Sequence, residues 1–222
     1  MKRDPEQTKT VPTIRTPVQR RSRDKFERIF TAAETLFATK GPQATSIQDI
    51  IELAGCSVGA FYQRFPDREA LVTAVLERFE DTVNAEIGAF FGATILTRMP
   101  LSQMVEEVVS FVFHLYTQKG GLFHSLMCLL ETSPAAREGK TCITTFAITQ
   151  FGNLLMQRKT ELAHPDPLLA ANMTMRMLIG VLDTQHIFSD GTQKDVDLPL
   201  EIIQAEMMQS VKSYLGIPQR ST

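Results

Sequence analysis

Three neighbouring side chains, Tyr62, Gln63 and Arg64, are of types that bind nucleic acid. A glutamine amide can form two hydrogen bonds with adenine, and a tyrosine hydroxyl or an arginine guanidinium can bind a phosphate. No catalytic pattern competes with this interpretation. The four histidines show neither a His-Glu-x-x-His motif nor paired i, i+4 spacing, and the chain has no glycine-rich phosphate loop or nucleophile elbow. We therefore expect no catalytic residue, no metal site and no cofactor.

A short helix is predicted just before these side chains. Ser46 is a good N-cap, and Asp49 stands where a capping-box acid would stand. Gly55 is the expected stop, because the residue just past a helix often needs a positive φ. The residues between them that share one face at helical spacing are Ile47, Ile50, Ile51 and Ala54.

A second short helix is predicted from Ser57, which can cap it. This helix would turn Phe61 and Phe65 inward and leave Gln63 and its neighbours facing out. Pro66 cannot continue it, so a further helix is expected beyond. Two such helices joined by a turn of three or four residues form a helix-turn-helix.

Residues 54–71, A-G-C-S-V-G-A-F-Y-Q-R-F-P-D-R-E-A-L, resemble the signature of the TetR family of transcriptional repressors. The chain departs from that pattern at Cys56, where valine is usual, at Ala60, where threonine or serine is usual, and at Arg68, where lysine is usual. Ala60 gives up a hydroxyl that could reach DNA. With the helix before it, the signature covers about a quarter of the chain.

The resemblance implies that the second helix enters the major groove of duplex DNA as a recognition helix. Gln63 is the best candidate for direct base readout, and Val58 could contact a thymine methyl group. The residues expected to contact bases or phosphates are Thr45, Ser46, Gln48, Val58, Gly59, Ala60, Tyr62, Gln63, Arg64 and Arg68.

The distribution of charge supports this expectation. The 222 residues carry a net charge of −2, but residues 1–68 hold 12 Lys+Arg against 8 Asp+Glu, whereas residues 69–222 hold 11 against 17. Much of the positive charge lies between Arg20 and Arg28. Such a run can be a plain solvated helix face, but beside a helix-turn-helix it is typical of a DNA-binding head on an acidic body.

Apolar periodicity predicts an all-α protein of about nine helices and no strand. We expect a disordered basic arm over 1–18, a DNA-binding domain over 19–66, and an effector-binding and dimerisation domain over 67–218. Breaks are predicted at 92–100 and at the Gly120-Gly121 pair. The helices expected outside the helix-turn-helix are 21–39, 67–91, 101–119, 122–131, 133–162, 167–188 and 199–215.

The body is expected to bind a small, largely apolar effector, as the resemblance implies. Its methionines and phenylalanines could line an adaptable cavity, although they also build ordinary cores. Polar residues among apolar neighbours could orient the ligand. The candidate effector-binding residues are Phe111, His114, Phe123, Met127, Phe146, Gln150 and Met177.

A single recognition helix reads few base pairs, so we expect a homodimer on a palindromic operator. The resemblance implies that the last two helices form the dimer interface as a four-helix bundle, although some of their apolar residues must fill the monomer core. The candidate contacts are Met173, Val181, Leu200, Ile203, Met207 and Val211.

Composition and cysteine usage favour a cytoplasmic protein. No apolar run is long enough to span a bilayer, no apolar stretch follows the first basic residues, and the three cysteines are widely spaced. The alternatives to a ligand-released repressor are a helical adaptor, a ligand-binding protein or an enzyme with a non-functional head. Sequence-selective, salt-dependent binding to duplex DNA discriminates the repressor from all three.

Overall fold

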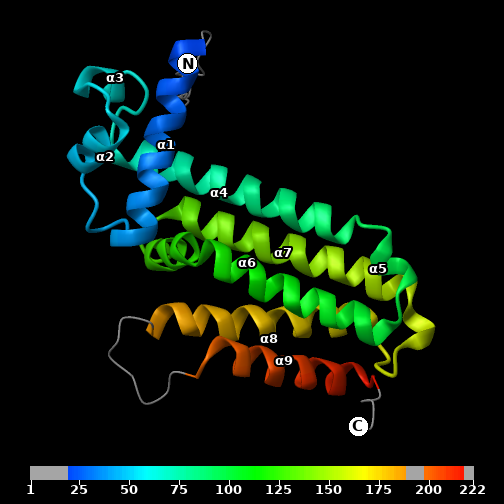
Figure 1. Ribbon diagram of the computed structural model, residues 1–222. Helices are drawn as coiled ribbons and strands as arrows, with labels where there is room; N and C mark the ends of the chain where they lie inside the picture. The colour runs from blue at the N-terminus through cyan, green and yellow to red at the C-terminus, as the bar shows by residue number, and fades with distance from the viewer. Residues whose placement is uncertain (1–19, 189–197, 218–222) are drawn as a thin grey trace, which may run out of the picture.

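The structure is a computed structural model that describes residues 20–188 and 198–217. The expected N-terminal arm and the end of the 67–218 region lie outside the described residues. Within them every regular element is a helix, as predicted, and none of these helices is long and apolar enough to cross a membrane. Three helices form a small head at one end (Figure 1): α1 (Arg20–Lys40), α2 (Ile47–Ala54) and α3 (Val58–Tyr62).

An aromatic cluster holds the head together. Phe61 and Phe65 are fully buried, and the Phe65 ring centroid lies 5.7 Å from that of Phe61 and 5.8 Å from those of Phe26 and Phe30. These edge-on, tilted and stacked contacts join the end of α3 to one face of α1. The short recognition segment is therefore fixed by packing rather than by its own helical propensity.

The helix α4 (Arg68–Phe91) leaves the head and runs the length of the body (Figure 1). Asp67 caps it by accepting a hydrogen bond from the Ala70 amide at 2.8 Å. Arg78 then joins α4 to α1 through ion pairs with Glu27 at 2.6 Å and Glu34 at 3.3 Å. The head is thus attached to the first turns of α4 by several polar contacts.

Five further α-helices and one 3-10 turn complete the described part of the body. Figure 1 shows α4, α7 and α6 above α8 and α9, which run antiparallel to each other along the lower side. The elements are α5 (Ile95–Arg98), α6 (Leu101–Leu129), α7 (Pro134–Gln157), η1 (Lys159–Glu161), α8 (Pro167–Phe188) and α9 (Leu200–Leu215).

One predicted interruption is confirmed and the other is wrong. The helix α4 ends at Phe91 and α6 begins at Leu101, with only the short helix α5 between them, whereas α6 continues through Gly120-Gly121 instead of turning there. A Cβ atom on Gly121 would lie 2.6 Å from the Ala38 carbonyl oxygen of α1. The glycine therefore lets α6 approach α1 closely, and it does not mark a turn.

The same contact is reinforced by a buried serine. One helical turn after Gly121, the Ser125 hydroxyl lies 2.7 Å from the Phe37 carbonyl oxygen of α1 and 2.9 Å from the Gly121 carbonyl oxygen. Gln43, just after α1, donates to the Cys128 carbonyl oxygen at 3.0 Å. The second half of α6 is thus the main support of the head on the body.

Candidate nucleic-acid interface

The turn between α2 and α3 has the geometry of a helix-turn-helix. Gly55 ends α2 in the left-handed region at φ 60°, and its amide bonds back to the carbonyl groups of Glu52 and Ile51. Two residues later Ser57 caps α3 by accepting the Ala60 amide at 3.2 Å. Cys56 lies half-buried between them and packs against the core.

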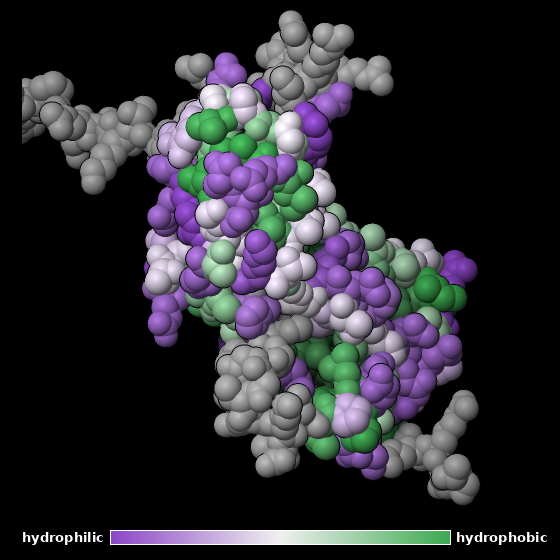
Figure 2. Space-filling view, turned by 60° about the vertical axis from the view of Figure 1, so that its left-hand side comes forward, coloured by the Kyte–Doolittle hydropathy of each residue, from purple (hydrophilic) through white to green (hydrophobic). Residues whose placement is uncertain are grey.

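The helix α3 has a packing face and an outer face. Phe61 is fully buried, whereas Val58 and Tyr62 are 52% and 48% exposed. Gly59 and Gln63 are also exposed, and Ala60 is half-buried. In Figure 2 the head, at the top of the molecule, carries green apolar surface among purple hydrophilic side chains. The outer face therefore offers both apolar contact and an amide.

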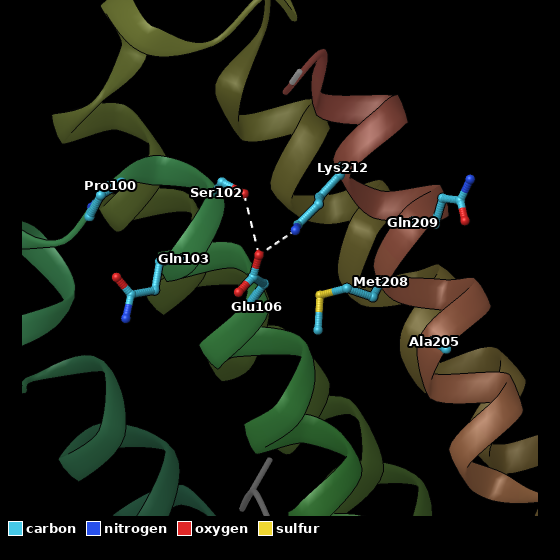
Figure 3. A pocket seen from close by; sticks show the side chains of 8 residues that line it. All are labelled: Pro100, Ser102, Gln103, Glu106, Ala205, Met208, Gln209 and Lys212. Atoms are coloured by element: carbon cyan, nitrogen blue, oxygen red, sulfur yellow. Dashed lines mark hydrogen bonds and ion pairs between the residues drawn. The ribbon is translucent and has the colours of Figure 1, made fainter. Parts of the chain in front are cut away.

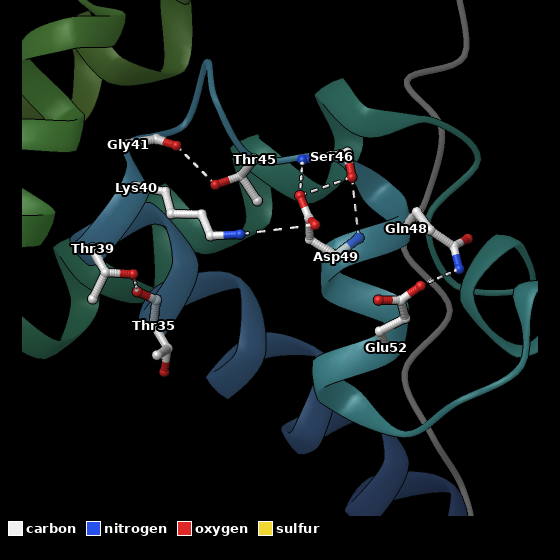
Figure 4. Close-up of polar contacts among 9 residues, drawn as sticks. All are labelled: Thr35, Thr39, Lys40, Gly41, Thr45, Ser46, Gln48, Asp49 and Glu52. Atoms are coloured by element: carbon white, nitrogen blue, oxygen red, sulfur yellow. Dashed lines mark hydrogen bonds and ion pairs between the residues drawn. The ribbon is translucent and has the colours of Figure 1, made fainter.

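The start of α2 is fixed by a complete capping box (Figure 4). The Asp49 carboxylate accepts the Ser46 amide and hydroxyl, both at 2.9 Å, and the Ser46 oxygen accepts the Asp49 amide at 3.1 Å. These hydrogen bonds, the backbone one above all, lower the pKa of Asp49. Ser46 is exposed, but its amide and hydroxyl already donate to Asp49, so a phosphate would have to compete with this carboxylate for them.

Thr45 was predicted to contact DNA, but the structure buries it. It is only 2% exposed, and its hydroxyl donates to the Gly41 carbonyl oxygen at 2.8 Å (Figure 4). This correction has a simple cause, because the hydroxyl closes the turn between α1 and α2 and is turned away from the surface. Thr45 therefore holds the turn and is not available as a phosphate contact.

The contact between Gln48 and Glu52 on α2 was not predicted from the sequence. Gln48 is exposed on α2, as expected, but its amide nitrogen donates to a Glu52 carboxylate oxygen at 2.9 Å (Figure 4). The bond uses an amide N–H and leaves the Gln48 oxygen as an acceptor. The i, i+4 spacing of the two residues could have revealed the pair from the sequence.

The two arginines of the predicted site are held against the head. The Arg64 guanidinium lies over the Phe26 ring, 5.5 Å from its centroid. Arg68 donates a hydrogen bond to the Pro42 carbonyl oxygen and so ties the start of α4 to the turn between α1 and α2. Both side chains are half-buried, and each has a structural partner in addition to any phosphate it could bind.

Comparison with known proteins decides the family. A model described as "Bacterial regulatory proteins, tetR family" matches residues 29–75, and one described as "Tetracyclin repressor-like, C-terminal domain" matches residues 100–194. The chain belongs to the TetR family. The two matches cover most of the head and most of the body, and they agree with the helix-turn-helix geometry described above.

Individual relatives match over short segments. The uncharacterized transcriptional regulator YerO of Bacillus subtilis is 45% identical over 56 residues, which is 25% of this chain and 19% of that protein. The transcriptional repressor KstR2 of Rhodococcus jostii is 32% identical over 73 residues, which is 33% of this chain and 36% of that protein. The matched segment thus spans about a third or less of these relatives.

A solved structure extends the likeness to the whole fold. A TetR-family regulator from Mesorhizobium loti superposes with a TM-score of 0.66 at 22% identity, over 90% of this chain and 98% of that chain. At this identity the likeness concerns the arrangement of the helices. It supports the two-part architecture of head and helical body within the TetR family.

The candidate effector residues do not form one site. Phe111 and Phe123 line a small cavity of about 20 Å³ enclosed by α4, α6, α7 and α8. Phe146 and Gln150 instead line an outer groove on α7 of about 620 Å³, and His114 is exposed. Met127 and Met177 are half-buried. The cavity-lining residues that the sequence analysis missed are Ile87, Phe91, Val112, Leu115, Tyr116, Ile143, Thr144, Ala147, Met175 and Ile179.

A third hollow, between α6 and α9, is polar. Figure 3 shows this groove of about 600 Å³, in which Lys212 of α9 forms an ion pair with Glu106 of α6. The Ser102 hydroxyl lies 3.4 Å from the same Glu106 oxygen. This groove contains none of the predicted effector residues. Its ion pair joins α6 to α9 and lies apart from the residues that line the apolar cavity.

Two candidate dimer contacts are wrong. Ile203 and Val211 are 7% and 0% exposed, because this face of α9 packs against the monomer core. Met173 of α8 is 40% exposed and so could meet a partner, whereas Val181, Leu200 and Met207 are half-buried. Other exposed apolar residues on α8, on α9 or just before α9 are Leu168, Leu169, Leu198 and Ile202.

Proposed function

We propose that the chain is a sequence-specific DNA-binding transcriptional regulator that acts as a repressor, and that a small, largely apolar effector releases it from its operator. The observation that carries this proposal is the outer face of α3, where Val58, Gly59, Tyr62 and Gln63 are exposed beside a capped turn. The repressor activity named for KstR2 of Rhodococcus jostii is consistent with it.

The geometry suggests how the head would read DNA. With α3 in the major groove, the Gln63 amide can reach an adenine edge and the Val58 side chain a thymine methyl group. The Tyr62 hydroxyl and the Arg64 guanidinium would flank the groove and bind phosphates. Both side chains are held by a ring of the head, because the Arg64 guanidinium lies over Phe26 and the Tyr62 ring packs edge-on against Phe61.

The test begins with selection of duplexes from a random pool, followed by fluorescence anisotropy of the selected duplex at several salt concentrations. A palindromic site whose affinity falls steeply with salt supports the proposal, because each neutralised phosphate releases counterions. If no duplex is enriched and residual binding ignores sequence, the proposal fails.

Two substitutions then distinguish base recognition by Gln63 from phosphate binding by Arg64. Gln63→Ala should relax one position of each half-site and cost about 1–3 kcal/mol of base discrimination. Arg64→Ala should weaken binding to all duplexes alike and reduce the salt slope by about 1. Anisotropy against the selected duplex and against duplexes changed at each position measures both effects. Equal loss on every duplex for Gln63→Ala would exclude it as a base-reading residue.

We propose that the operator-binding form is a homodimer that uses the outer sides of α8 and α9. Met173→Glu places a carboxylate on the exposed face of α8 and should raise the dimer Kd by about tenfold or more, because a buried unpaired charge is costly. Sedimentation equilibrium measures this change. Ile95→Glu, at a 61% exposed position on the distant α5, is the control and should leave the Kd unchanged. If Met173→Glu and Ile95→Glu change the dimer Kd equally, the proposal that α8 and α9 form the interface is wrong.

A further inference from the structure

Three side chains from three helices meet beside the apolar cavity. Lys140 of α7 donates to both carboxylate oxygens of Asp183 on α8, at 2.8 and 2.7 Å, and to the Tyr116 hydroxyl of α6 at 3.3 Å. Tyr116 donates to Asp183 at 2.9 Å. We call these residues the Tyr-Lys-Asp network.

The Tyr-Lys-Asp network extends from the cavity towards solvent. The Tyr116 ring lines the cavity and stacks on Phe123 with centroids 4.1 Å apart. The side chains of Lys140 and Asp183 are 17% and 15% exposed. Burial, and then the nearby Asp183 carboxylate, raise the pKa of Tyr116 well above its usual value, so its hydroxyl stays neutral. Tyr116 is the one member of the network among the lining residues, and Asp183 lies behind its hydroxyl, so a ligand reaches Asp183 when the cavity widens past Tyr116.

The ion pair of Lys140 and Asp183 can still accept a hydrogen bond, but it has no donor left. An ammonium group has three N–H donors, and those of Lys140 have three acceptors in the two Asp183 oxygens and the Tyr116 oxygen. A carboxylate can accept about four hydrogen bonds. Asp183 accepts three, two of them at Oδ1, which leaves room at Oδ2. A ligand group can therefore bind this ion pair without breaking an existing hydrogen bond only if it donates a hydrogen bond to Asp183.

We infer that the cavity takes a flat apolar molecule carrying a hydrogen-bond donor, a hydroxyl or an amine, which bonds to Asp183. This inference rests on the effector part of the proposed function and gives the effector a chemical class. A carboxylate ligand is disfavoured, because it would face the Asp183 carboxylate and find the Lys140 donors already engaged. The aromatic residues that line the cavity, among them Phe91 and Phe111, favour a planar body.

Binding must widen the cavity. Its volume of about 20 Å³ has room for about one water molecule. Met175 of α8, one of its lining residues, is a side chain type that readily changes shape. The Tyr-Lys-Asp network ties α6, α7 and α8 together around the cavity, so a ligand that bonds to Asp183 acts on all three helices at once.

The test compares three naphthalene probes with the full chain and no DNA: 2-naphthol, which donates, naphthalene, which cannot, and 2-naphthoate, which is anionic. The chain contains no tryptophan, so the fluorescence of each probe can be followed directly. We expect 2-naphthol to bind about tenfold or more tighter than naphthalene, because hydrogen bonds to charged groups are the strong ones. 2-Naphthoate should bind more weakly than 2-naphthol.

A double variant tests the role of the pair itself. Lys140→Met with Asp183→Leu removes both charges, leaves no orphaned ion and should abolish the preference for 2-naphthol over naphthalene. The control is Lys212→Met with Glu106→Leu at the α6–α9 ion pair shown in Figure 3, which should keep that preference.

Several results would overturn the inference: equal affinities of 2-naphthol and naphthalene, tightest binding of 2-naphthoate, an unchanged preference in the Lys140/Asp183 variant, or no binding of any probe. Operator binding is measured separately by anisotropy. Loss of the probe preference with intact DNA binding would refute only this inference, whereas absence of selective DNA binding would refute the proposed function.

Discussion

Replacing Phe65 with alanine is expected to destabilise the head by about 3–5 kcal/mol and to abolish selective DNA binding. The ring is fully buried, and it contacts Phe26, Phe30 and Phe61 with centroids no more than 5.8 Å away. Removing it leaves a cavity between α1 and α3 that five residues of helix cannot close. Guanidinium denaturation followed by circular dichroism gives the free energy of unfolding, and anisotropy gives the affinity for DNA.

The control for Phe65→Ala is Tyr62→Ala, which removes an aromatic ring from the exposed side of the same segment. Tyr62 is 48% exposed, so its loss should change the free energy of unfolding by less than about 1 kcal/mol while still weakening DNA binding. If the two variants lose stability equally, the division of α3 into a packing face and an outer face is wrong.

Gly121→Ala is expected to lower the free energy of unfolding by about 1–3 kcal/mol and to weaken DNA binding. The added Cβ would lie 2.6 Å from the Ala38 carbonyl oxygen and 2.8 Å from its Cα, so one backbone must move. That movement would also disturb the Ser125 contact with the Phe37 carbonyl oxygen. Thermal unfolding and anisotropy against the operator measure the two losses.

A second glycine provides the comparison for Gly121. Gly180 lies within α8, and a Cβ there would meet nothing within 4 Å. Alanine is favoured over glycine inside a helix by about 1 kcal/mol, so Gly180→Ala should leave the stability of the single subunit unchanged or raise it. Stabilisation by both substitutions would show that α6 and α1 tolerate a wider separation, and the role given to Gly121 would be wrong.

The head could be predicted well because its signals are local. Ser46, Gly55, Ser57 and Phe61 act within a few residues of their positions in the chain, and the capping box and left-handed turn follow from their types. Thr45 was misplaced because its residue type suits either a surface contact or a turn. The structure resolves this through its bond to the Gly41 carbonyl oxygen.

The body was predicted less well because its decisive contacts are distant in the chain. The Gly120-Gly121 pair resembles a turn until Ala38, more than eighty residues earlier, is seen against it. Apolar spacing along α9 is the same whether a residue faces its own core or a partner, so Val211 could not be assigned. Tyr116 and Asp183 are 67 residues apart, and no spacing rule predicts their hydrogen bond.

The separation of buried packing residues from exposed residues in the α3 segment affects how such a regulator can change the DNA sequence that it binds. Phe61 and Phe65 carry the stability of the segment, whereas Val58, Gly59 and Gln63 are exposed and contribute little to it. Substitutions at the exposed positions can therefore accumulate one after another without unfolding the head at any step. A duplicated copy of this chain could come to bind a different DNA sequence by a few such steps while its helical body stayed the same.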